Sequence, residues 1–254
     1  MPAARLVLGL DFDGTLAPIV RQPQDARPDA ATLELVRELA SCLQTVAVIS
    51  GRDTGLLARW LPVPRLRLIG NHGLEEWRDG TSVPIPAVVP FMPALARVRR
   101  EIERLPELRL PGVMLEVKLA ILSVHFRNAA DPVDIGRTLK EVLAPIVDAT
   151  GLRLHPARFV WEIRPPVAVD KGAAIERLRD DLRPQGLIYV GDDVPDAAAF
   201  EALAAMHEVA TLAVGVRSAE VPEDVFAACD LVLDSPDGVR DLLSALRTRL
   251  CHPG

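Results

Sequence analysis

Two aspartates stand directly after the first apolar run of the sequence. Asp11 and Asp13 belong to the segment DFDGT, which follows the run LVLGL at 6–10. A spacing of two residues lets both carboxylates face one crevice at the carboxyl end of a strand, where ligands of open α/β sheets bind. Two carboxylates held close together need a cation or a shared proton. The structural alternative is a solvated turn, which is typical of Asp-Gly pairs.

Three further segments offer groups that suit an anion or a metal ion. The run 46–49 leads into Ser50, whose hydroxyl and following amides can hold an anion or cap the next helix. Lys171 opens a helical pattern, where its ammonium adds to the attraction of a helix N-terminus for anions. The run 187–190 leads into GDDVPD, whose carboxylates fit a hard divalent cation better than an acidic first helical turn. These carboxylates belong to Asp192, Asp193 and Asp196.

The elements that must position these residues alternate along the chain. Continuous apolar runs between helical patterns indicate strands that are buried on both faces of a parallel sheet, which predicts an α/β fold. Because the carboxyl ends of parallel strands share one edge, the motifs that follow them are expected to meet there. We expect helices at 29–43, 54–61, 172–182, 196–206 and 239–250, and strands at 6–10, 46–49, 66–69, 187–190, 212–216 and 231–233.

The middle of the chain has a different pattern. Asp79 and Gly80 are typical of a hairpin turn, and a proline-rich segment follows at 84–93. The expected order beyond it is αββαββ, typical of a small antiparallel sheet covered by helices. We therefore expect one core formed by 1–86 and 167–254, with an α+β domain inserted at 87–166. The inserted helices are expected at 94–105 and 132–149, and the inserted strands at 113–117, 120–126, 152–154 and 159–163.

Composition narrows the class of protein. Of 254 residues, 49% are apolar and 25% are charged, which indicates a globular chain and excludes a disordered or fibrous one. The net charge of −6, without a basic stretch, argues against nucleic acid or an anionic membrane as a partner. No apolar run reaches the roughly 18–20 residues that span a bilayer, and no leader is recognised, so we expect a cytoplasmic protein. Cys42, Cys229 and Cys251 lack metal-ligand spacing and are expected to be reduced thiols.

In this order, DFDGT, Ser50, Lys171 and GDDVPD resemble the motifs of the haloacid-dehalogenase (HAD) superfamily of phosphotransferases. The resemblance implies a HAD-like Rossmannoid parallel-sheet core. It also implies that Asp11 attacks phosphorus to form an aspartyl-phosphate, and that Asp13 protonates the leaving oxygen and then activates water. Ser50 and Lys171 would hold the transferring phosphoryl group, and Mg²⁺ would be the cofactor. The metal ligands implied are Asp11, Asp13 through its carbonyl, Asp192 and Asp193, with Asp196 nearby.

Nearly the whole chain is similar to trehalose-6-phosphate phosphatases in particular. The matching segments are LDFDGTLAPIV, ISGR, GNHGLE, GVMLEVKLAILSVHFR, VWEIRPPVAVDKG and GDD. The resemblance implies trehalose 6-phosphate as the substrate, the inserted domain as a cap over it, and a trehalose-6-phosphate synthase as a candidate partner. The substrate contacts implied are Gly14, Thr15, Arg52, His72, Glu116, Lys118, His125, Arg127 and Glu162.

Some of these assignments have alternatives. Glu116 and Lys118 alone would be a surface ion pair on an exposed sheet face, and Arg52 and His72 could equally cap a helix and a turn. The family pattern GDDxTDE is also altered, because Pro195 replaces a hydroxyl residue and Ala197 replaces an acid. We expect this change to affect the orientation of metal ligands more than the reaction class. A phosphatase for another sugar phosphate (sucrose, glucosylglycerol or mannosylglycerate phosphate) and a sugar-phosphate-binding subunit without catalysis remain alternatives.

Overall fold

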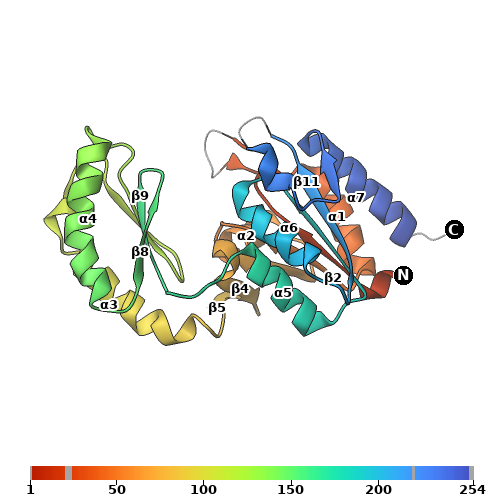
Figure 1. Ribbon diagram of the computed structural model, residues 1–254, viewed down its shortest axis with the longest axis horizontal. Helices are drawn as coiled ribbons and strands as arrows, with labels where there is room; N and C mark the ends of the chain where they lie inside the picture. The colour runs from red at the N-terminus through yellow and green to blue at the C-terminus, as the bar shows by residue number, and fades with distance from the viewer. Residues whose placement is uncertain (1, 21–24, 219–220, 252–254) are drawn as a thin grey trace. The chain divides into compact units, whose positions relative to one another are not determined.

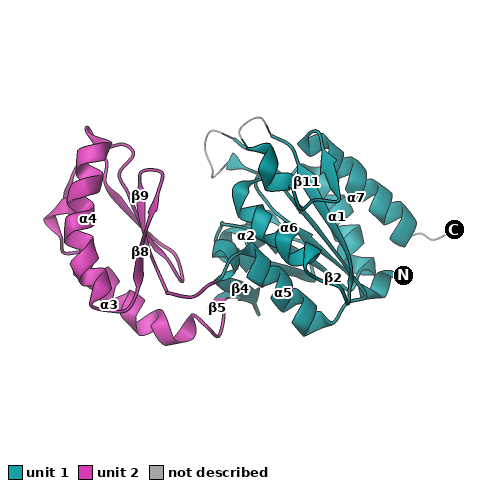
Figure 2. Cartoon of the chain, viewed as in Figure 1, with its two compact units in different colours: residues 1–82, 169–254 teal, residues 83–168 magenta. Residues whose placement is uncertain are grey.

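The computed structural model describes residues 2–20, 25–218 and 221–251. The chain divides into two compact units, of which unit 1 comprises Met1–Ser82 and Val169–Gly254, and unit 2 comprises Val83–Ala168 (Figure 2). Within the described ranges, every helix is too short or too polar to cross a membrane. Short 3₁₀ helices lie at η1 Ala3–Arg5, η3 Asn71–Gly73, η4 Val89–Phe91, η5 Pro106–Arg109, η6 Val194–Asp196 and η7 Glu223–Phe226.

Unit 1 is built on a mainly parallel sheet, which confirms the predicted α/β class. The order of its strands is β12-β11-β10-β1-β2-β3-β4-β5, and the strands from β12 to β3 are parallel, whereas β4 is antiparallel to β3. The parallel strands are β1 Leu6–Leu10, β2 Thr45–Ile49, β3 Leu66–Gly70, β10 Gly186–Gly191, β11 Ala210–Val216 and β12 Leu231–Leu233. The hairpin predicted around Asp79 and Gly80 is formed by β4 Glu75–Arg78 and β5 Thr81–Pro84.

Helices cover both faces of this sheet (Figure 1). Leu8 and Leu10 of β1 pack into a core cluster with α1 and α7, whereas Val7 packs into a second cluster with α5 and α6, as alternation along a strand requires. Aspartates cap three of the helices by accepting backbone N–H groups of the first turn: Asp29 for α1, Asp53 for α2 and Asp170 for α5. The helices are α1 Ala30–Cys42, α2 Thr54–Trp60, α5 Lys171–Leu182, α6 Ala197–Ala204 and α7 Pro236–Leu250.

Unit 2 is a separate antiparallel sheet of order β6-β7-β9-β8 with two helices, in the predicted order αββαββ. Leu122 and Val124 of β7 pack into the core with the helices, so Ser123 and His125 lie on the opposite face of the sheet. The proline-rich segment is more structured than predicted, since Pro93 lies in the first turn of α3, where its missing N–H is not needed. The elements are α3 Met92–Ile102, β6 Met114–Val117, β7 Leu122–His125, α4 Pro132–Asp148, β8 Arg153–Ala157 and β9 Val160–Arg164.

The prediction of reduced thiols is wrong for two of the three cysteines. Cys42 and Cys251 form a disulfide, with their Cα atoms 5.5 Å apart. Cys42 is the last residue of α1 and Cys251 follows the last residue of α7, and the two helices pack in the same core cluster. The sequence gives no signal for this pair, because the two residues are separated by 209 positions and meet only through helix packing. Cys229 is the free cysteine of the described residues.

We expect Cys42→Ser to lower the melting temperature of the protein measured without reductant. A crosslink across 209 residues restricts the unfolded chain, and its loss costs about 2–5 kcal/mol of unfolding free energy. Differential scanning calorimetry with and without dithiothreitol measures the effect, with Cys229→Ser as the matched control. Reductant should lower the melting temperature of the control but leave that of Cys42→Ser unchanged. If reductant did not change the melting temperature of the control, the crosslink would be contradicted.

Candidate active site

Three buried carboxylates meet at the carboxyl edge of the parallel sheet. Asp11 directly follows β1 and Asp192 directly follows β10, and these strands are parallel neighbours with Leu10 opposite Val190. Carboxylate oxygens of Asp11, Asp192 and Asp196 lie within 4.8 Å of one another, and all three residues are at most 4% exposed. Buried like charges at this spacing repel, so the cluster requires positive charge beside it.

Lys171 supplies part of that charge. Its Nζ lies 2.7 Å from Asp11 Oδ1 and 2.6 Å from Asp196 Oδ1, and the side chain is 3% exposed. The lysine is the first residue of α5, where the Asp170 cap fixes the start of the helix. Burial alone would lower the pKa of Lys171, but the carboxylates of Asp11 and Asp196 outweigh it and raise that pKa. Lys171 is therefore held as a charged ammonium.

The charge of the cluster is still negative, since one ammonium faces three carboxylates. Burial raises the pKa of the Asp11 carboxyl well above its ordinary value; Lys171 opposes the shift, whereas Asp196 and Asp192 add to it. Burial and the neighbouring Asp196 likewise raise the pKa of Asp192 to about 6. Carboxylate oxygens are the ligands that hard divalent cations prefer, and such a cation would relieve this repulsion. The donor set therefore fits Mg²⁺.

Asp196 organises the cluster through both of its oxygens. Oδ1 accepts hydrogen bonds from Lys171 and from the hydroxyl of Tyr189, at 2.6 and 2.5 Å. Oδ2 accepts the backbone N–H groups of Asp192 and Asp193, at 3.2 and 3.1 Å. Because four donors already surround its carboxylate, Asp196 serves to orient the neighbouring groups. Asp11 and Asp192 are then the carboxylates that can contact a cation. Sequence reasoning missed Tyr189, although it is the only tyrosine of the chain and stands two residues before GDD.

The structure does not bring Asp193 into this group. Its side chain is exposed and accepts the backbone N–H of Val194 at 2.7 Å, which caps the 3₁₀ turn η6. Asp193 and Asp196 together form a capping box around this turn. Pro195 lies in the first turn of η6, a position that proline fits because no backbone N–H is required there. The alteration of the motif at Pro195 is therefore compatible with the local structure.

The segment after Asp11 is shaped by contact with the acidic cluster. Gly14 has φ +82°, and a Cβ there would lie 1.9 Å from Asp192 Oδ2, so only glycine fits. Thr15 Oγ1 donates to Asp192 Oδ1 at 3.3 Å. The Asp13 carboxylate is bound at both oxygens by Arg52, with Nε–Oδ2 at 2.7 Å and Nη2–Oδ1 at 2.6 Å. This bidentate pair orients Asp13, whose side chain is 35% exposed.

Ser50 and His72 lie on two loops that are tied together at the same edge. Ser50 follows β2, is 1% exposed, and accepts the backbone N–H of Arg52 at its Oγ, at 3.2 Å. His72 donates its backbone N–H to the Ser50 carbonyl at 2.9 Å. A Cβ at Gly51 would lie 2.7 Å from the imidazole of His72, so the ring packs directly on the serine loop. Since Asp53 caps α2, Arg52 has no capping role there.

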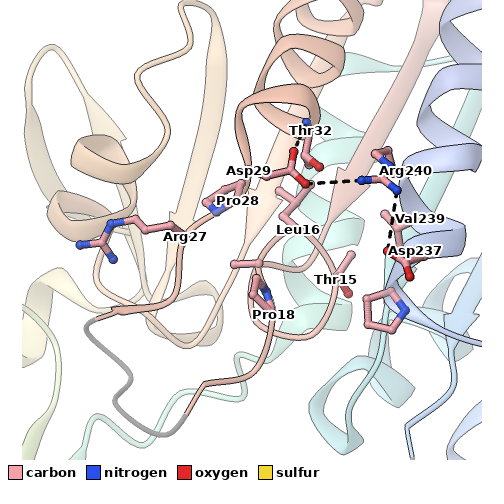
Figure 3. Close-up of a pocket in the computed structure, with 12 residues that line it drawn as sticks. Thr15, Leu16, Pro18, Arg27, Pro28, Asp29, Thr32, Asp237, Val239 and Arg240 are labelled. Atoms are coloured by element: carbon pink, nitrogen blue, oxygen red, sulfur yellow. Dashed lines mark hydrogen bonds and ion pairs between the residues drawn. The ribbon is translucent and has the colours of Figure 1, made fainter.

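A pocket of about 470 Å³ borders Thr15 where α1 and α7 begin (Figure 3). Figure 3 shows Arg240 between Asp29 and Asp237, with ion pairs of 3.7 and 3.8 Å, whereas the side chain of Arg27 points away from them. Because these carboxylates already compensate Arg240, the pocket suits a phosphate less well than the edge that carries Ser50 and Lys171.

The open face of the unit 2 sheet carries most of the other predicted residues. Glu116, Ser123 and Glu162 lie directly opposite one another on β6, β7 and β9. His125 Nε2 lies 2.9 Å from Glu116 Oε2, and Lys118 Nζ lies 4.0 Å from Glu116 Oε1. These groups form a polar row of donors and acceptors, which is the type of surface that binds sugar hydroxyls.

Two further features of unit 2 concern arginines. Arg127 lies two residues beyond the end of β7 and is exposed, so it does not continue the strand face of His125. Arg164, which sequence reasoning did not single out, forms an ion pair with Glu162 on the same strand. The spacing of two residues on β9 was the available signal, because it places both side chains on one face.

Comparisons with known proteins agree with this architecture. Residues 9–229 match the family model described as trehalose-phosphatase. The trehalose-phosphate phosphatase of Mycobacterium marinum is 33% identical over an alignment of 251 residues, which covers 96% of this chain and 62% of that protein. This chain thus spans less than two thirds of the length of that relative.

Two solved structures show the same fold. A trehalose-6-phosphate phosphatase related protein is 24% identical and superposes with a TM-score of 0.74 over 96% of this chain and 97% of that chain. A haloacid dehalogenase-like hydrolase from Bacteroides thetaiotaomicron is 15% identical, with a TM-score of 0.64 over 94% and 98% of the two chains. The predicted HAD-like core with an inserted α+β domain is therefore confirmed.

We expect Tyr189→Phe to lower the free energy of unfolding by about 1.5–3 kcal/mol, because a buried carboxylate loses a hydroxyl donor. Urea denaturation measures the change. The matched control is Ser41→Ala, which removes an exposed hydroxyl bonded to the Glu38 carbonyl and should change the stability by less than about 0.5 kcal/mol. Equal losses in the two variants would refute the role given to Tyr189.

Proposed function

The chain belongs to the trehalose-phosphatase family, and from this premise we propose that it hydrolyses trehalose 6-phosphate to trehalose and phosphate. The single observation that supports this most directly is the buried Asp11 carboxylate held against Lys171 at the carboxyl edge of the sheet. A carboxylate beside a permanently charged ammonium can attack phosphorus while the ammonium stabilises the negative phosphoryl oxygens.

The proposed reaction has two displacements. An Asp11 oxygen attacks phosphorus, an aspartyl-phosphate forms, and the bond from phosphorus to the sugar oxygen breaks as Asp13 gives that oxygen its proton. Asp13 then takes a proton from water, whose oxygen attacks phosphorus and releases phosphate from Asp11. Arg52 contacts both oxygens of Asp13 and so fixes the position of this carboxyl group. Ser50 and Lys171 bind the phosphoryl oxygens.

Mg²⁺ is the cofactor that the cluster fits. Asp11, Asp192 and the backbone carbonyl of Asp13 would hold it, and the ion would supply positive charge to the phosphoryl group. Asp196 is already surrounded by four donors and serves to orient Lys171 and the backbone that leads into Asp193. Thr15 adds a hydrogen bond that restricts the carboxylate of Asp192.

We assign recognition of the sugar to unit 2. Glu116, Lys118 and Glu162 offer charged donors and acceptors for several hydroxyl groups, and His125 orients Glu116. Ser123 lies between the two glutamates, is 1% exposed, and its Oγ has no hydrogen-bond partner in the part of the chain that the structure describes. A buried hydroxyl of this kind favours a polar ligand on this face.

Asp11→Asn should lower phosphate release from trehalose 6-phosphate by at least about a thousandfold, because the neutral amide cannot form the covalent intermediate. A phosphate-release assay with Mg²⁺ measures the rate, and calorimetry checks that the variant is folded. Asp148→Asn, at an exposed position of α4, should keep the full rate. EDTA should stop phosphate release by the unmodified protein, and added Mg²⁺ should restore it. Substantial turnover by Asp11→Asn would exclude Asp11 as the nucleophile.

Glu116→Gln and Glu162→Gln should lower kcat/KM for trehalose 6-phosphate by about 10–100-fold, since each removes a charged partner of sugar hydroxyls. The same variants should hydrolyse p-nitrophenyl phosphate at an unchanged rate, and Glu141→Gln on the exposed side of α4 should behave as the parent. A panel of sugar phosphates checks the assignment. If sucrose or glucosylglycerol phosphate gave the higher kcat/KM, the phosphatase assignment would stand and the trehalose assignment would fall.

A further inference from the structure

An arginine-rich recess lies at the edge of the unit 1 sheet opposite the candidate active site. It has a volume of about 420 Å³, within the range of small-ligand sites. Strands β2 and β3 begin here and β4 ends here, whereas Asp11 and Asp192 follow the carboxyl ends of their strands. The residues that matter to its chemistry are Arg65, Arg67, Arg78, Glu76 and Asp181.

The base of the recess is a buried carboxylate shared by arginines. Glu76 is 4% exposed and lies 3.1 Å from Arg67, 2.7 Å from Arg78 and 3.8 Å from Arg177. Burial acts to raise the pKa of Glu76, but Arg78 and Arg67 outweigh it and lower that pKa. Both oxygens of Glu76 are therefore engaged as acceptors, and its single charge is divided among several guanidinium groups.

The lining of the recess carries more positive than negative charge. Three arginines face two carboxylates, of which Asp181 pairs with Arg67 at 2.5 Å, and Arg177 adds a fourth cation behind Glu76. Arg65 is exposed and has no carboxylate partner within the ranges 2–20, 25–218 and 221–251. This local excess is notable in a chain whose net charge is −6.

The position of Arg65 is held by an unusual backbone. It has φ +67°, in the left-handed region that residues other than glycine, asparagine and aspartate rarely adopt. Arg65 directly precedes β3, is exposed and lines the recess. Arg78 uses Nε and Nη2 for Glu76, and its side chain is 57% exposed. Trp77, between Glu76 and Arg78 on β4, packs against the core cluster on the other face of the sheet, as alternation along a strand requires.

We propose that this recess binds a small anion with several phosphate groups, in the manner of a linear triphosphate. Guanidinium groups match phosphate oxygens in charge and in planar geometry, and Arg65 and Arg78 can each offer donors that the protein itself does not use. A single phosphate would span less of the recess than a chain of phosphates does. The triphosphate group of a nucleotide shares this chemistry.

The rival explanation is that the network only joins β3, β4 and α5. Glu76, Arg67 and Asp181 serve this purpose, because they connect the two strands to the helix. Arg65 takes no part in those links, so it separates the two explanations. A purely structural network does not depend on Arg65, whereas an anion site does.

Titration of the full chain with sodium tripolyphosphate in EDTA, followed by isothermal calorimetry, tests the proposal. We expect saturable binding that weakens as KCl rises, because the attraction is electrostatic. Arg65→Asn should weaken it at least about tenfold, while asparagine tolerates the left-handed backbone. Arg249→Asn, at an exposed position of α7, should bind as the parent does. Melting curves of the two variants verify that both are folded.

Two further binding measurements locate the site and identify the ligand. Ser50→Ala should leave tripolyphosphate binding unchanged, because its serine lies at the opposite edge of the sheet. Tighter binding of ATP than of tripolyphosphate, weakened in the same way by Arg65→Asn, would identify a nucleotide, and equal binding would identify the phosphate chain alone. The proposal is overturned if the parent does not bind, if Arg65→Asn binds as the parent does, or if Ser50→Ala abolishes binding.

Discussion

The repulsion among three buried carboxylates is the constraint on which the site depends. Asp11 and Asp192 directly follow adjacent strands and Asp196 ends η6, and all three are buried where water screens their charges poorly. Lys171 offsets part of this repulsion, and its own burial is tolerated only because two carboxylates contact it. Each partner therefore stabilises the other, and removing one would leave an uncompensated charge. A site with this remaining negative charge is suited to a divalent cation and then to a phosphate group.

The fold provides several independent supports for this arrangement. Parallel pairing of β1 with β10 sets the separation of Asp11 and Asp192, and the Asp170 cap sets the start of α5 and so the origin of the Lys171 side chain. Tyr189 reaches Asp196 from inside the β10 strand, where it is fully buried. These supports come from different elements, so the geometry is fixed by packing before any ligand binds. Preorganisation of this kind is what electrostatic stabilisation of a transferring phosphoryl group requires.

The sequence predicted the parts of the site that depend on strand order. The residues that directly follow β1, β2 and β10 could be placed at one edge because parallel strands share a direction, and Asp11, Ser50 and Asp192 do lie there. Contacts that depend on packing between distant segments were not predictable: the pair of Cys42 with Cys251 requires the placement of α1 against α7, and the bidentate contact of Arg52 with Asp13 requires the path of two loops. The separate role of Asp193 depended on a capping geometry that the run GDDVPD alone does not specify.

The altered acidic motif shows which part of that segment carries the chemistry. Pro195 occupies the first turn of η6, where its ring fits and where no N–H donor is lost. Ala197 begins α6, one residue beyond the last carboxylate of the cluster. The hydrogen bonds that shape the segment run instead from Tyr189, Lys171 and the backbone to Asp196. Both substitutions lie outside this network, so the contacts of Asp196 are intact, which supports the proposed phosphatase over the alternative of a binding subunit without catalysis.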